Sequence, residues 1–327
     1  MLSALRVCIL GAGSFGRVHA RWWRAVPGAE LMAVASRNPE DLPSDDAWRG
    51  LLRRSYEDVF SNPDGIDLLD IVTPSALHSA HAIRALKCGV HVLVEKPMAT
   101  TRENAEAMIE AARESNRRLF VVSQYRYVPA YRVVSSVAAA AGVSRARFEY
   151  VMPPEAAGFD RDSWKCDPAL SGGGILFGSG IHLVDLLVHW FGEPAEVESR
   201  IEYDKTAKGI ESGYEAGWRG AHDERVEIVS RVESGTKHTT RLDLEFAGGK
   251  AVIENRRLVR GSSPLPWKLR ELALGVREKI IPWRRDPLGR QFSDIVRAVA
   301  SGGHAEVEGE EGLRALRTIL RIRDSAA

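Results

Sequence analysis

The sequence predicts an α/β protein with two domains. The first, residues 1–124, is expected to be a doubly wound parallel sheet, and the second, residues 125–327, an α+β domain with a large, mostly antiparallel sheet. Three observations carry this prediction. Apolar strand-like runs alternate with helical patterns in the first part, a glycine-rich turn follows the first of these runs, and segments of alternating polarity fill residues 196–255. The length of 327 residues also favours two domains over one.

The composition is that of an ordinary globular protein and narrows the function classes. Hydrophobic residues make up 44% and charged residues 27%, and the net charge is +1. This balance gives no electrostatic reason to expect nucleic acid as a partner. Cys8, Cys88 and Cys166 form no CxxC pair, which argues against a zinc site or a disulfide framework and favours a reducing compartment. We therefore expect no metal site.

The sequence also indicates a cytoplasmic protein. The N-terminus passes directly into a predicted strand, without the basic region and cleavage site of a signal peptide. The most apolar long stretch, residues 172–192, contains His182, Asp185 and His189 and is a poor membrane span. We expect no membrane span.

The glycine-rich turn lies between a predicted strand, Leu5–Leu10, and a helical pattern that runs to Ala25. In this context GxGxxG is typical of dinucleotide-binding Rossmann domains. The first glycine allows the turn, the second lets backbone approach a pyrophosphate, and the third permits close helix packing. The helix N-terminus favours the anion. The residues of the predicted pyrophosphate site are Gly11, Gly13, Ser14, Phe15 and Gly16.

The second predicted strand, residues 30–35, ends at Ser36 and Arg37. NAD enzymes usually carry Asp or Glu at this distance from the glycines, where it binds the ribose 2′-hydroxyl. Serine and arginine can instead donate hydrogen bonds to a 2′-phosphate, and the missing carboxylate removes a repulsion. The pair predicts a preference for NADP(H). NAD(H) is the alternative, if Arg37 only stacks on the adenine.

The following segments complete the predicted parallel sheet. We expect a polar connector with some helical character over 41–54 and a short helix over 55–60. Strands are expected over 66–72, 91–94 and 119–123, with helices over 78–87 and 102–115 between them. Thr101 is the expected cap of the last of these helices. Thr73 and Pro74 follow the third strand and His78 begins the next helix, near the expected nicotinamide side.

The run His91–Val94 is short, apolar and β-branched, as in a strand covered on both faces. Glu95, Lys96 and Pro97 then end the strand, because proline cannot continue a sheet ladder. Ligands of open parallel sheets bind outside the carboxyl ends of the strands. Lys96 is thus placed for chemistry or for binding an anion, although a surface lysine at a strand end is the alternative interpretation.

These motifs resemble those of the Gfo/Idh/MocA family of nicotinamide-dependent oxidoreductases, over essentially the whole chain. The matching residues are Gly11, Gly13, Gly16, Thr73, Pro74, His78 and the run from Gly89 to Pro97. The resemblance implies that Lys96 contacts the substrate hydroxyl and assists proton transfer. We assign Thr73, Pro74, His78, Glu95 and Lys96 to the cofactor site together with the glycine turn, Ser36 and Arg37.

Two segments of the second half resemble family elements near the substrate. Residues 124–129 are similar to the segment where the chain leaves the cofactor domain, which implies substrate roles for Arg126 and Tyr127. The element Trp164-Lys165-Cys166-Asp167 resembles one that precedes the family's glycine triplet. Trp164 could form a wall for a sugar ring or could be a core tryptophan. Asp167 is kept as a substrate-binding candidate.

Residues 172–185 predict a glycine-rich turn that enters a helix, with His182 and Asp185 on one helix face. From the residues alone, His182 could be a core histidine. The resemblance implies that it contacts substrate, and imidazole titrates near neutrality, which suits proton exchange with an alcohol. Many family members carry Asp or Asn where this chain has Gly178, so an expected carboxylate is absent. Ser179 is the neighbouring polar candidate.

The rest of the chain predicts a sheet and terminal helices. Alternating segments over 196–202, 226–232, 238–246 and 250–255 favour an antiparallel sheet, and family members commonly form dimers or tetramers through this sheet. We therefore expect a homodimer or homotetramer. Residues 256–290 are basic and contain Trp267 and Trp283, which suits an anionic substrate, a solvated insertion or an oligomer contact. Helices are expected over 291–300 and 312–322.

Together these observations predict an NADP(H)-preferring oxidoreductase. We expect hydride transfer between the nicotinamide and a hydroxyl or ketone carbon of a sugar, a cyclitol or a nucleotide sugar, with Lys96 and His182 as the catalytic residues. Three alternatives stay open. They are a nicotinamide-dependent glycosidase, a non-catalytic cofactor-binding sensor or accessory protein, and a reductase of a diol, an imine or a tetrapyrrole.

Overall fold

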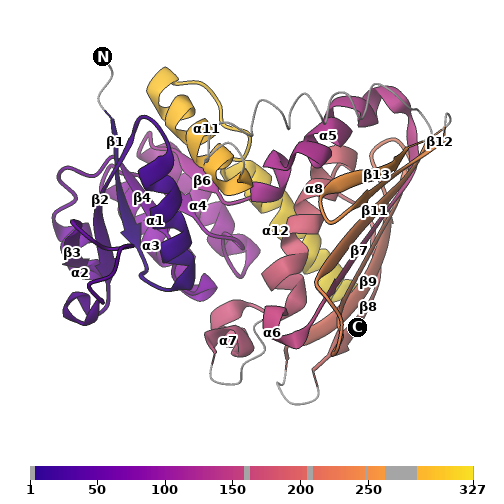
Figure 1. The fold of residues 1–327 in the computed structure, drawn as a ribbon, viewed down its shortest axis with the longest axis horizontal. Coiled ribbons are helices and arrows are strands. Elements are labelled where there is room, and N and C mark those ends of the chain that lie inside the picture. Colours follow the sequence, from indigo (N-terminus) through magenta and orange to yellow (C-terminus); the bar gives the residue numbers. More distant parts are fainter. Residues whose placement is uncertain (1–3, 158–162, 205–208, 247–248, 262–285, 327) are drawn as a thin grey trace. The chain divides into compact units, whose positions relative to one another are not determined.

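The computed structural model describes residues 4–157, 163–204, 209–246, 249–261 and 286–326 (Figure 1). The chain forms two compact units, one of Met1–Ser123 with Ile281–Leu313 and one of Gln124–Ile280 with Arg314–Ala327. The first break lies next to the predicted boundary between residues 124 and 125. The return of residues 281–313 to the first unit is not part of the sequence prediction, because a helical pattern does not say which sheet the helix packs on.

The first unit contains a parallel sheet of six strands in the order β3-β2-β1-β4-β5-β6, which confirms the predicted doubly wound fold. Its strands are β1 (Leu5–Leu10), β2 (Ala29–Ser36), β3 (Leu52–Ser55), β4 (Leu68–Ile71), β5 (His91–Val94) and β6 (Leu119–Val121). Its helices are α1 (Ser14–Ala25), α2 (Tyr56–Ser61), α3 (His78–Lys87), α4 (Arg102–Glu114) and α11 (Pro287–Ser301). The order places the ends of β1, β4 and β5 side by side.

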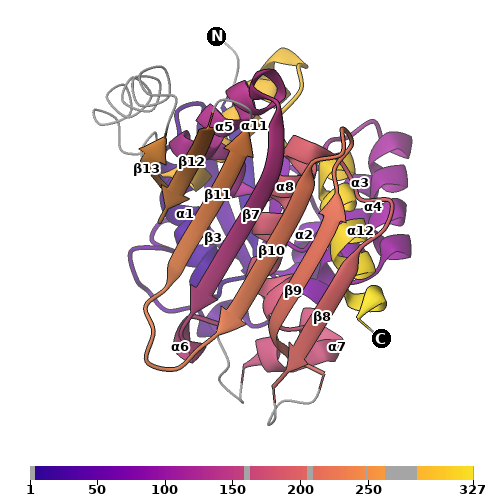
Figure 2. The ribbon, with the colours of Figure 1, turned by 90° about the vertical axis from the view of Figure 1, so that its right-hand side faces the viewer.

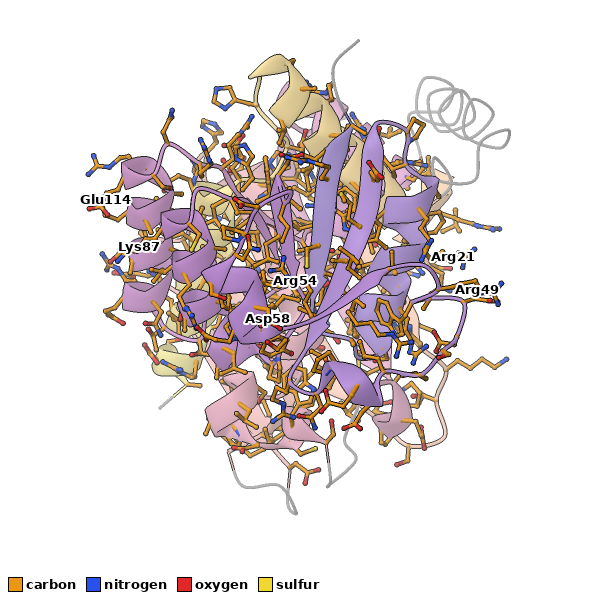
Figure 3. All side chains as sticks on the ribbon, turned by 90° about the vertical axis from the view of Figure 1, so that its left-hand side faces the viewer. Arg21, Arg49, Arg54, Asp58, Lys87 and Glu114 are labelled. Atoms are coloured by element: carbon orange, nitrogen blue, oxygen red, sulfur yellow. The ribbon has the colours of Figure 1, made fainter. Side chains whose placement is uncertain are left out.

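Strand β3 corrects the prediction of a polar, partly helical connector over residues 41–54. It pairs with β2 at the sheet edge, where Ser55 is the partner of Ser36. None of its four residues is buried. An edge strand of this kind has no apolar face, so the alternation that identifies most strands is missing. Figure 3 shows Arg54, from this strand, beside Asp58 of α2, whose backbone carbonyl accepts a hydrogen bond from Arg54 Nη2 at 2.5 Å.

Helices cover both faces of the parallel sheet. Figure 3 shows Arg21 of α1 on one side of the strands and Lys87 of α3 and Glu114 of α4 on the other. Helix α11 packs against α1, and the ring of Phe292 stacks on Trp23 with a centroid distance of 4.1 Å. Gln291 also completes the end of β6, donating to the Val121 carbonyl at 2.7 Å and accepting from the Ser123 N–H at 3.0 Å. Buried apolar and polar contacts thus hold α11 in this unit.

The second unit contains a seven-stranded sheet in the order β13-β12-β11-β7-β10-β9-β8 (Figure 2). Its strands are β7 (Val143–Met152), β8 (Glu198–Tyr203), β9 (Glu211–Arg219), β10 (Arg225–Val232), β11 (Thr239–Phe246), β12 (Gly249–Glu254) and β13 (Arg257–Gly261). Only the β7–β10 pair is parallel, so the predicted mostly antiparallel sheet is confirmed. Strands β9 and β13 are not among the predicted segments. Most of the basic segment 256–290, with Trp267 and Trp283, lies outside the described residues.

Helices cover one face of this sheet and leave the other open (Figure 2). They are α5 (Pro129–Ala141), α6 (Pro154–Ala157), α7 (Pro168–Ser171), α8 (Ile181–Phe191) and α12 (Gly309–Ser325). Among the described residues, the helical stretch Pro168–Phe191 is long and apolar enough to cross a membrane by length and composition alone, and 78% of its most apolar window is buried inside the structure. A buried core helix passes the same test, so this is weak evidence for a span.

Candidate functional site

The glycine turn after β1 is built as a cofactor-binding turn requires. Gly11 has φ +119°, and a Cβ there would lie 2.5 Å from the Val72 carbonyl oxygen. A Cβ on Gly16 would overlap the carbonyl oxygen of Gly11, so the third residue of α1 must be glycine. A Cβ on Gly13 would meet nothing within 4 Å. The first and third glycines therefore serve packing, and the second faces open space.

Helix α1 begins at Ser14 without a side-chain cap, and Ser14 and Phe15 are both exposed at its first turn. The first N–H groups of a helix have no partner within the helix and form a favourable site for an anion. Ser14 and Phe15 thus lie at the predicted pyrophosphate position.

The end of β2 presents an unsatisfied polar atom. Ser36 Oγ is buried and has no hydrogen-bond partner among the described residues, while the neighbouring Arg37 is exposed. Tyr56, which follows the paired strand β3, lies close enough for the Arg37 charge to lower its pKa, although burial raises that pKa by more. The Tyr56 ring packs edge-on against His81, at a centroid distance of 5.3 Å. Sequence reasoning did not single out Tyr56 or His81.

His78 connects the turns after β4 and β5. Its Nε2 lies 2.8 Å from the Thr73 carbonyl oxygen, and its Nδ1 lies 2.8 Å from the Pro97 carbonyl oxygen. Burial lowers the pKa of His78, and the two carbonyl oxygens oppose that shift. His78 therefore holds Thr73, Pro74 and the Lys96-Pro97 turn in one arrangement rather than facing solvent.

Lys96 is half-buried at the end of β5, next to a buried carboxylate. Glu95 Oε2 accepts the backbone N–H of Lys96 at 3.0 Å. Glu95 Oε1 lies 3.0 Å from His19 Nε2, and His19 Nδ1 lies 2.8 Å from Asp70 Oδ2. Glu95, predicted as a cofactor residue, thus contacts the protein interior.

Sequence reasoning missed His19 and Asp70. A signal was available, because Asp70 lies inside an apolar strand of a sheet expected to be covered on both faces. A charge in such a place requires a partner. The partner, His19, comes from α1 and is fully buried.

In the second unit, His182 lies in the first turn of α8 and is buried. Its ring stacks on Tyr125, with a centroid distance of 4.8 Å and an interplanar angle of 13°. Arg126, the next residue after Tyr125, donates from Nε and Nη2 to the two oxygens of Asp185, at 2.8 and 2.6 Å. Tyr125 and Arg126 therefore contact the helix face that carries His182 and Asp185.

The glycine-rich stretch before His182 packs against β9. A Cβ on Gly173 would lie 2.6 Å from the Phe177 ring, and a Cβ on Gly174 would overlap the backbone of Glu211. Gly178, by contrast, lies in a π-helical turn, Leu176–Gly180, where a Cβ would meet nothing within 4 Å. Packing therefore requires glycine at positions 173 and 174, whereas Gly178 faces open space.

The remaining predicted substrate residues lie in three environments. Tyr127 is buried at 4% exposure, whereas Trp164 is 37% exposed and is not a core tryptophan. Asp167 is exposed and caps α7, accepting the Ala169 N–H at 2.9 Å. Ser179 is half-buried in the π-helical turn, where its hydrogen bond lowers the pKa of Tyr150 against the dominant effect of burial.

The first unit fits a dinucleotide cofactor. Gly13 leaves open space beside an uncapped helix N-terminus, and Ser36 Oγ, at the end of β2, is buried without a partner among the described residues. These features and the ends of β4 and β5 lie at the carboxyl ends of neighbouring strands in one parallel sheet. Among the described residues, no group of three His, Cys, Asp or Glu side chains is arranged to hold a metal ion.

Two protein-family models match the chain. Residues 5–123 match the oxidoreductase family with an NAD-binding Rossmann fold, and residues 143–268 match the GFO/IDH/MocA C-terminal domain. Together these ranges cover well over half of the chain.

Two individual relatives are each less than 30% identical to this chain. Levoglucosan dehydrogenase of Pseudarthrobacter phenanthrenivorans is 28% identical over 223 residues, which are 64% of this chain and only 57% of that protein. UDP-N-acetylglucosamine 3-dehydrogenase of Acidithiobacillus ferrooxidans is 26% identical over 326 residues, 98% of this chain and 96% of that protein.

The same fold occurs in the WlbA dehydrogenase from Bordetella pertussis, whose structure was solved in complex with NADH and UDP-GlcNAcA. The TM-score is 0.85 at 22% identity, over 99% of this chain and 96% of that one. At this identity the likeness concerns the fold. The two family matches, which join a glycine-turn Rossmann unit to the C-terminal domain, establish that the chain belongs to the Gfo/Idh/MocA family of oxidoreductases.

Proposed function

We propose that this protein is an NADP(H)-preferring oxidoreductase that interconverts a hydroxyl and a ketone on a sugar, a cyclitol or a nucleotide sugar. The observation that carries the proposal is the placement of Lys96 at the same sheet edge as the glycine turn. They follow β5 and β1, and only β4 lies between these two strands. A lysine there suits polarisation of a carbonyl held at a nicotinamide.

In this proposal Lys96 exchanges a proton with the oxygen of the reacting carbon, and His182 is a second proton-exchanging or orienting group. The nicotinamide supplies the hydride chemistry when it is bound. The protein supplies the placement of the oxygen and the charge around it. Lys96 belongs to the first unit and His182 to the second.

The preference for NADP(H) is supported by the end of β2. No carboxylate lies at the end of the strand, where Ser36 and Arg37 offer hydrogen-bond donors instead. Ser36 Oγ lacks a protein partner among the described residues, as a group reserved for a ligand would. The solved WlbA dehydrogenase holds NADH, so NAD(H) is the competing cofactor to be tested.

The substrate class is supported by the relatives, which are named for levoglucosan and for UDP-N-acetylglucosamine. The test is a panel of free sugars, cyclitols, anhydrosugars and nucleotide sugars, with reduction or oxidation of the cofactor followed at 340 nm. Turnover on one of these groups is the expected result. Cofactor binding without turnover on any of them would favour the non-catalytic alternative. Cleavage of a glycoside without net cofactor consumption would favour the glycosidase.

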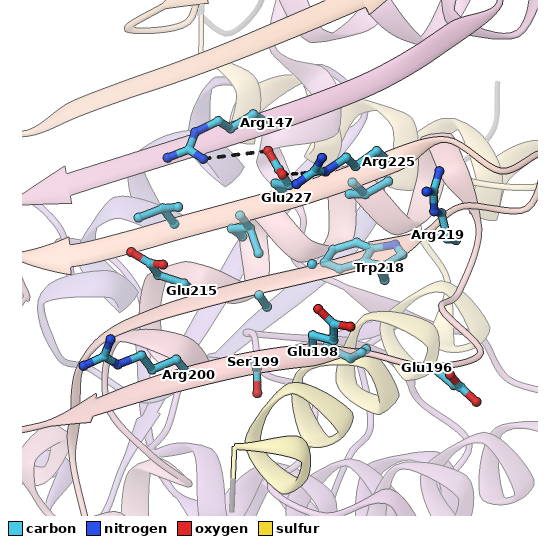
Figure 4. A pocket seen from close by; sticks show the side chains of 16 residues that line it. Arg147, Glu196, Glu198, Ser199, Arg200, Glu215, Trp218, Arg219, Arg225 and Glu227 are labelled. Carbon is cyan, nitrogen blue, oxygen red and sulfur yellow. Dashed lines mark ion pairs between the residues drawn. The ribbon is translucent and has the colours of Figure 1, made fainter.

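We also propose a cytoplasmic homodimer or homotetramer formed through the open face of the second sheet. This face carries a depression of about 660 Å³ lined by β7–β10 (Figure 4). In it Arg147 and Arg225 lie 3.7 and 2.7 Å from Glu227, and Arg231 pairs with Glu215 nearby at 2.5 Å. Interspersed charges of both signs can complement a second copy related by a two-fold axis. Light scattering after gel filtration at low and high salt tests this, and a monomer in both would contradict it.

A further inference from the structure

A buried histidine that the proposed reaction does not use lies beside the strand end that carries Lys96. His19 is in the second turn of α1 and has no exposed surface. Its ring lies between Asp70 of β4, at 2.8 Å from Nδ1, and Glu95 at the end of β5, at 3.0 Å from Nε2. One imidazole therefore joins the glycine-turn helix to two neighbouring strands.

The proton count of this cluster follows from its geometry. Both ring nitrogens face carboxylate oxygens, and imidazole donates from both nitrogens only when it is protonated. Burial opposes the charged form, but Asp70 and Glu95 outweigh burial and raise the pKa of His19 to about 10. When both carboxylates are ionised, the cluster of His19, Asp70 and Glu95 carries one positive and two negative charges, a net charge of −1.

The cluster reaches Lys96 through Glu95. One oxygen of Glu95 contacts the His19 ring, and the other accepts the backbone N–H of Lys96 at 3.0 Å. The charges of both Glu95 and Lys96 also act on His78 of α3.

Aromatic groups close the cluster on its other side. The Trp23 indole N–H donates to Asp70 Oδ2 at 2.7 Å. Phe292 of α11 packs edge-on against the His19 ring, at a centroid distance of 5.1 Å. Water therefore has little access to the three charges, and their effect on a neighbour is weakly screened.

We propose that His19 is a positioning residue for Lys96. It neutralises one of the two carboxylates of the cluster, and it holds the Glu95 carboxylate that accepts the Lys96 backbone N–H. The inference rests on the proposed role of Lys96. The cluster acts on Lys96 through its charge. A more negative cluster favours the ammonium form of Lys96, and a neutral cluster favours the amine.

The test measures the pH dependence of Lys96 acylation by acetic anhydride, read by mass spectrometry of the Lys96 peptide. Lys87, exposed on α3 (Figure 3), is the internal reference. His19→Gln leaves a net charge of −2 and should raise the labelling midpoint of Lys96 by about one pH unit, the shift that one unit charge at about 12 Å causes at an effective dielectric constant of about 20. Glu95→Gln leaves a neutral cluster and should lower the midpoint by a similar amount.

The double variant, His19→Gln with Glu95→Gln, restores a net charge of −1, so its midpoint should return close to that of the wild type. A purely structural role predicts neither opposite shifts nor their cancellation. Equal midpoints in the wild type and Glu95→Gln would overturn the inference, and so would a double variant that keeps the shift of Glu95→Gln.

Folding of each variant is checked by circular dichroism. If His19→Gln alone does not fold, Glu95→Gln and the double variant still test the electrostatic role of His19. No substrate is needed for the labelling. Undiminished turnover of Lys96→Ala would therefore reject the proposed function, while the labelling shifts would separately accept or reject the electrostatic role of His19.

Discussion

Arg126 and Asp185 form a buried two-point ion pair in the second unit, with the two side chains 4% and 5% exposed. Two nitrogens of the guanidinium face the two oxygens of the carboxylate, at 2.8 and 2.6 Å. The sequence resemblance implies a substrate role for Arg126. The observed geometry assigns two of its donors to α8, the helix that carries His182.

Replacing Arg126 by alanine would leave the Asp185 carboxylate buried without this partner. We expect the free energy of unfolding to fall by about 3–5 kcal/mol, the usual cost of breaking a buried pair from one side. Urea unfolding measures it, with Arg132→Ala, an exposed arginine of α5, as the matched control. An unchanged unfolding curve together with a raised KM would instead support the substrate role.

Lys96→Ala should abolish most of the turnover while leaving cofactor binding intact. Loss of a positioned proton-transfer group typically costs about 10²–10⁴-fold in rate. Steady-state rates on the substrate found by the panel measure the first effect, and quenching of tryptophan fluorescence by the cofactor measures the second. Lys87→Ala is the control and should keep full activity. Turnover at the wild-type level in Lys96→Ala would remove the lysine from the mechanism.

Arg37→Ala should weaken binding of NADPH about tenfold, and of NADH much less, because only the former carries a 2′-phosphate for the guanidinium to contact. Arg49→Ala, at another exposed arginine (Figure 3), should change neither affinity. Fluorescence titrations of the two cofactors provide the comparison. Tighter binding of NADH than of NADPH by the wild type would contradict the proposed preference.

Gly178→Ala and Gly174→Ala should differ sharply in stability. A Cβ on Gly178 meets nothing within 4 Å, so alanine there should leave the free energy of unfolding within about 0.5 kcal/mol of the wild type. A Cβ on Gly174 would overlap the Glu211 backbone, and overpacking of this kind costs about 1–3 kcal/mol. Thermal unfolding of the two variants is the measurement. Equal losses of stability in the two variants would contradict the open space next to Gly178.

The stability that His19 contributes should depend on pH in one direction. Its pKa is raised from 6.5 to about 10 in the folded protein. The contribution is therefore complete below pH 6.5 and is lost as pH rises through about 10. Urea unfolding of the wild type and of His19→Gln across this range should give curves that converge toward high pH. A constant difference from pH 6 to pH 10 would show that the ring does not carry the charge.

Much of the fold and part of the candidate site can be predicted from the sequence, because the signals involved are local. A glycine turn between a strand and a helix, and a proline that ends a strand, depend on neighbouring residues only. These patterns located β1, α1 and β5 and placed Gly11 and Lys96 at the ends of their strands.

Other features depend on packing between distant segments and carry no local pattern. Strand β3 is an exposed edge without alternation, and α11 returns to the first sheet from almost 170 residues beyond β6 because Gln291 and Phe292 fit there. Cys88 follows an apolar helix pattern, which favours burial, yet it lies exposed after the last turn of α3.

The sequence by itself determined the fold class, the family resemblance and the residues at the ends of the parallel strands. Only the tertiary structure decided what their neighbours are. It showed that Arg126 pairs with Asp185 and that His19 lies between Asp70 and Glu95. The physical reason is that a buried charge must be matched by another charge or by hydrogen bonds, and the chain can supply the partner from any element that packs against it.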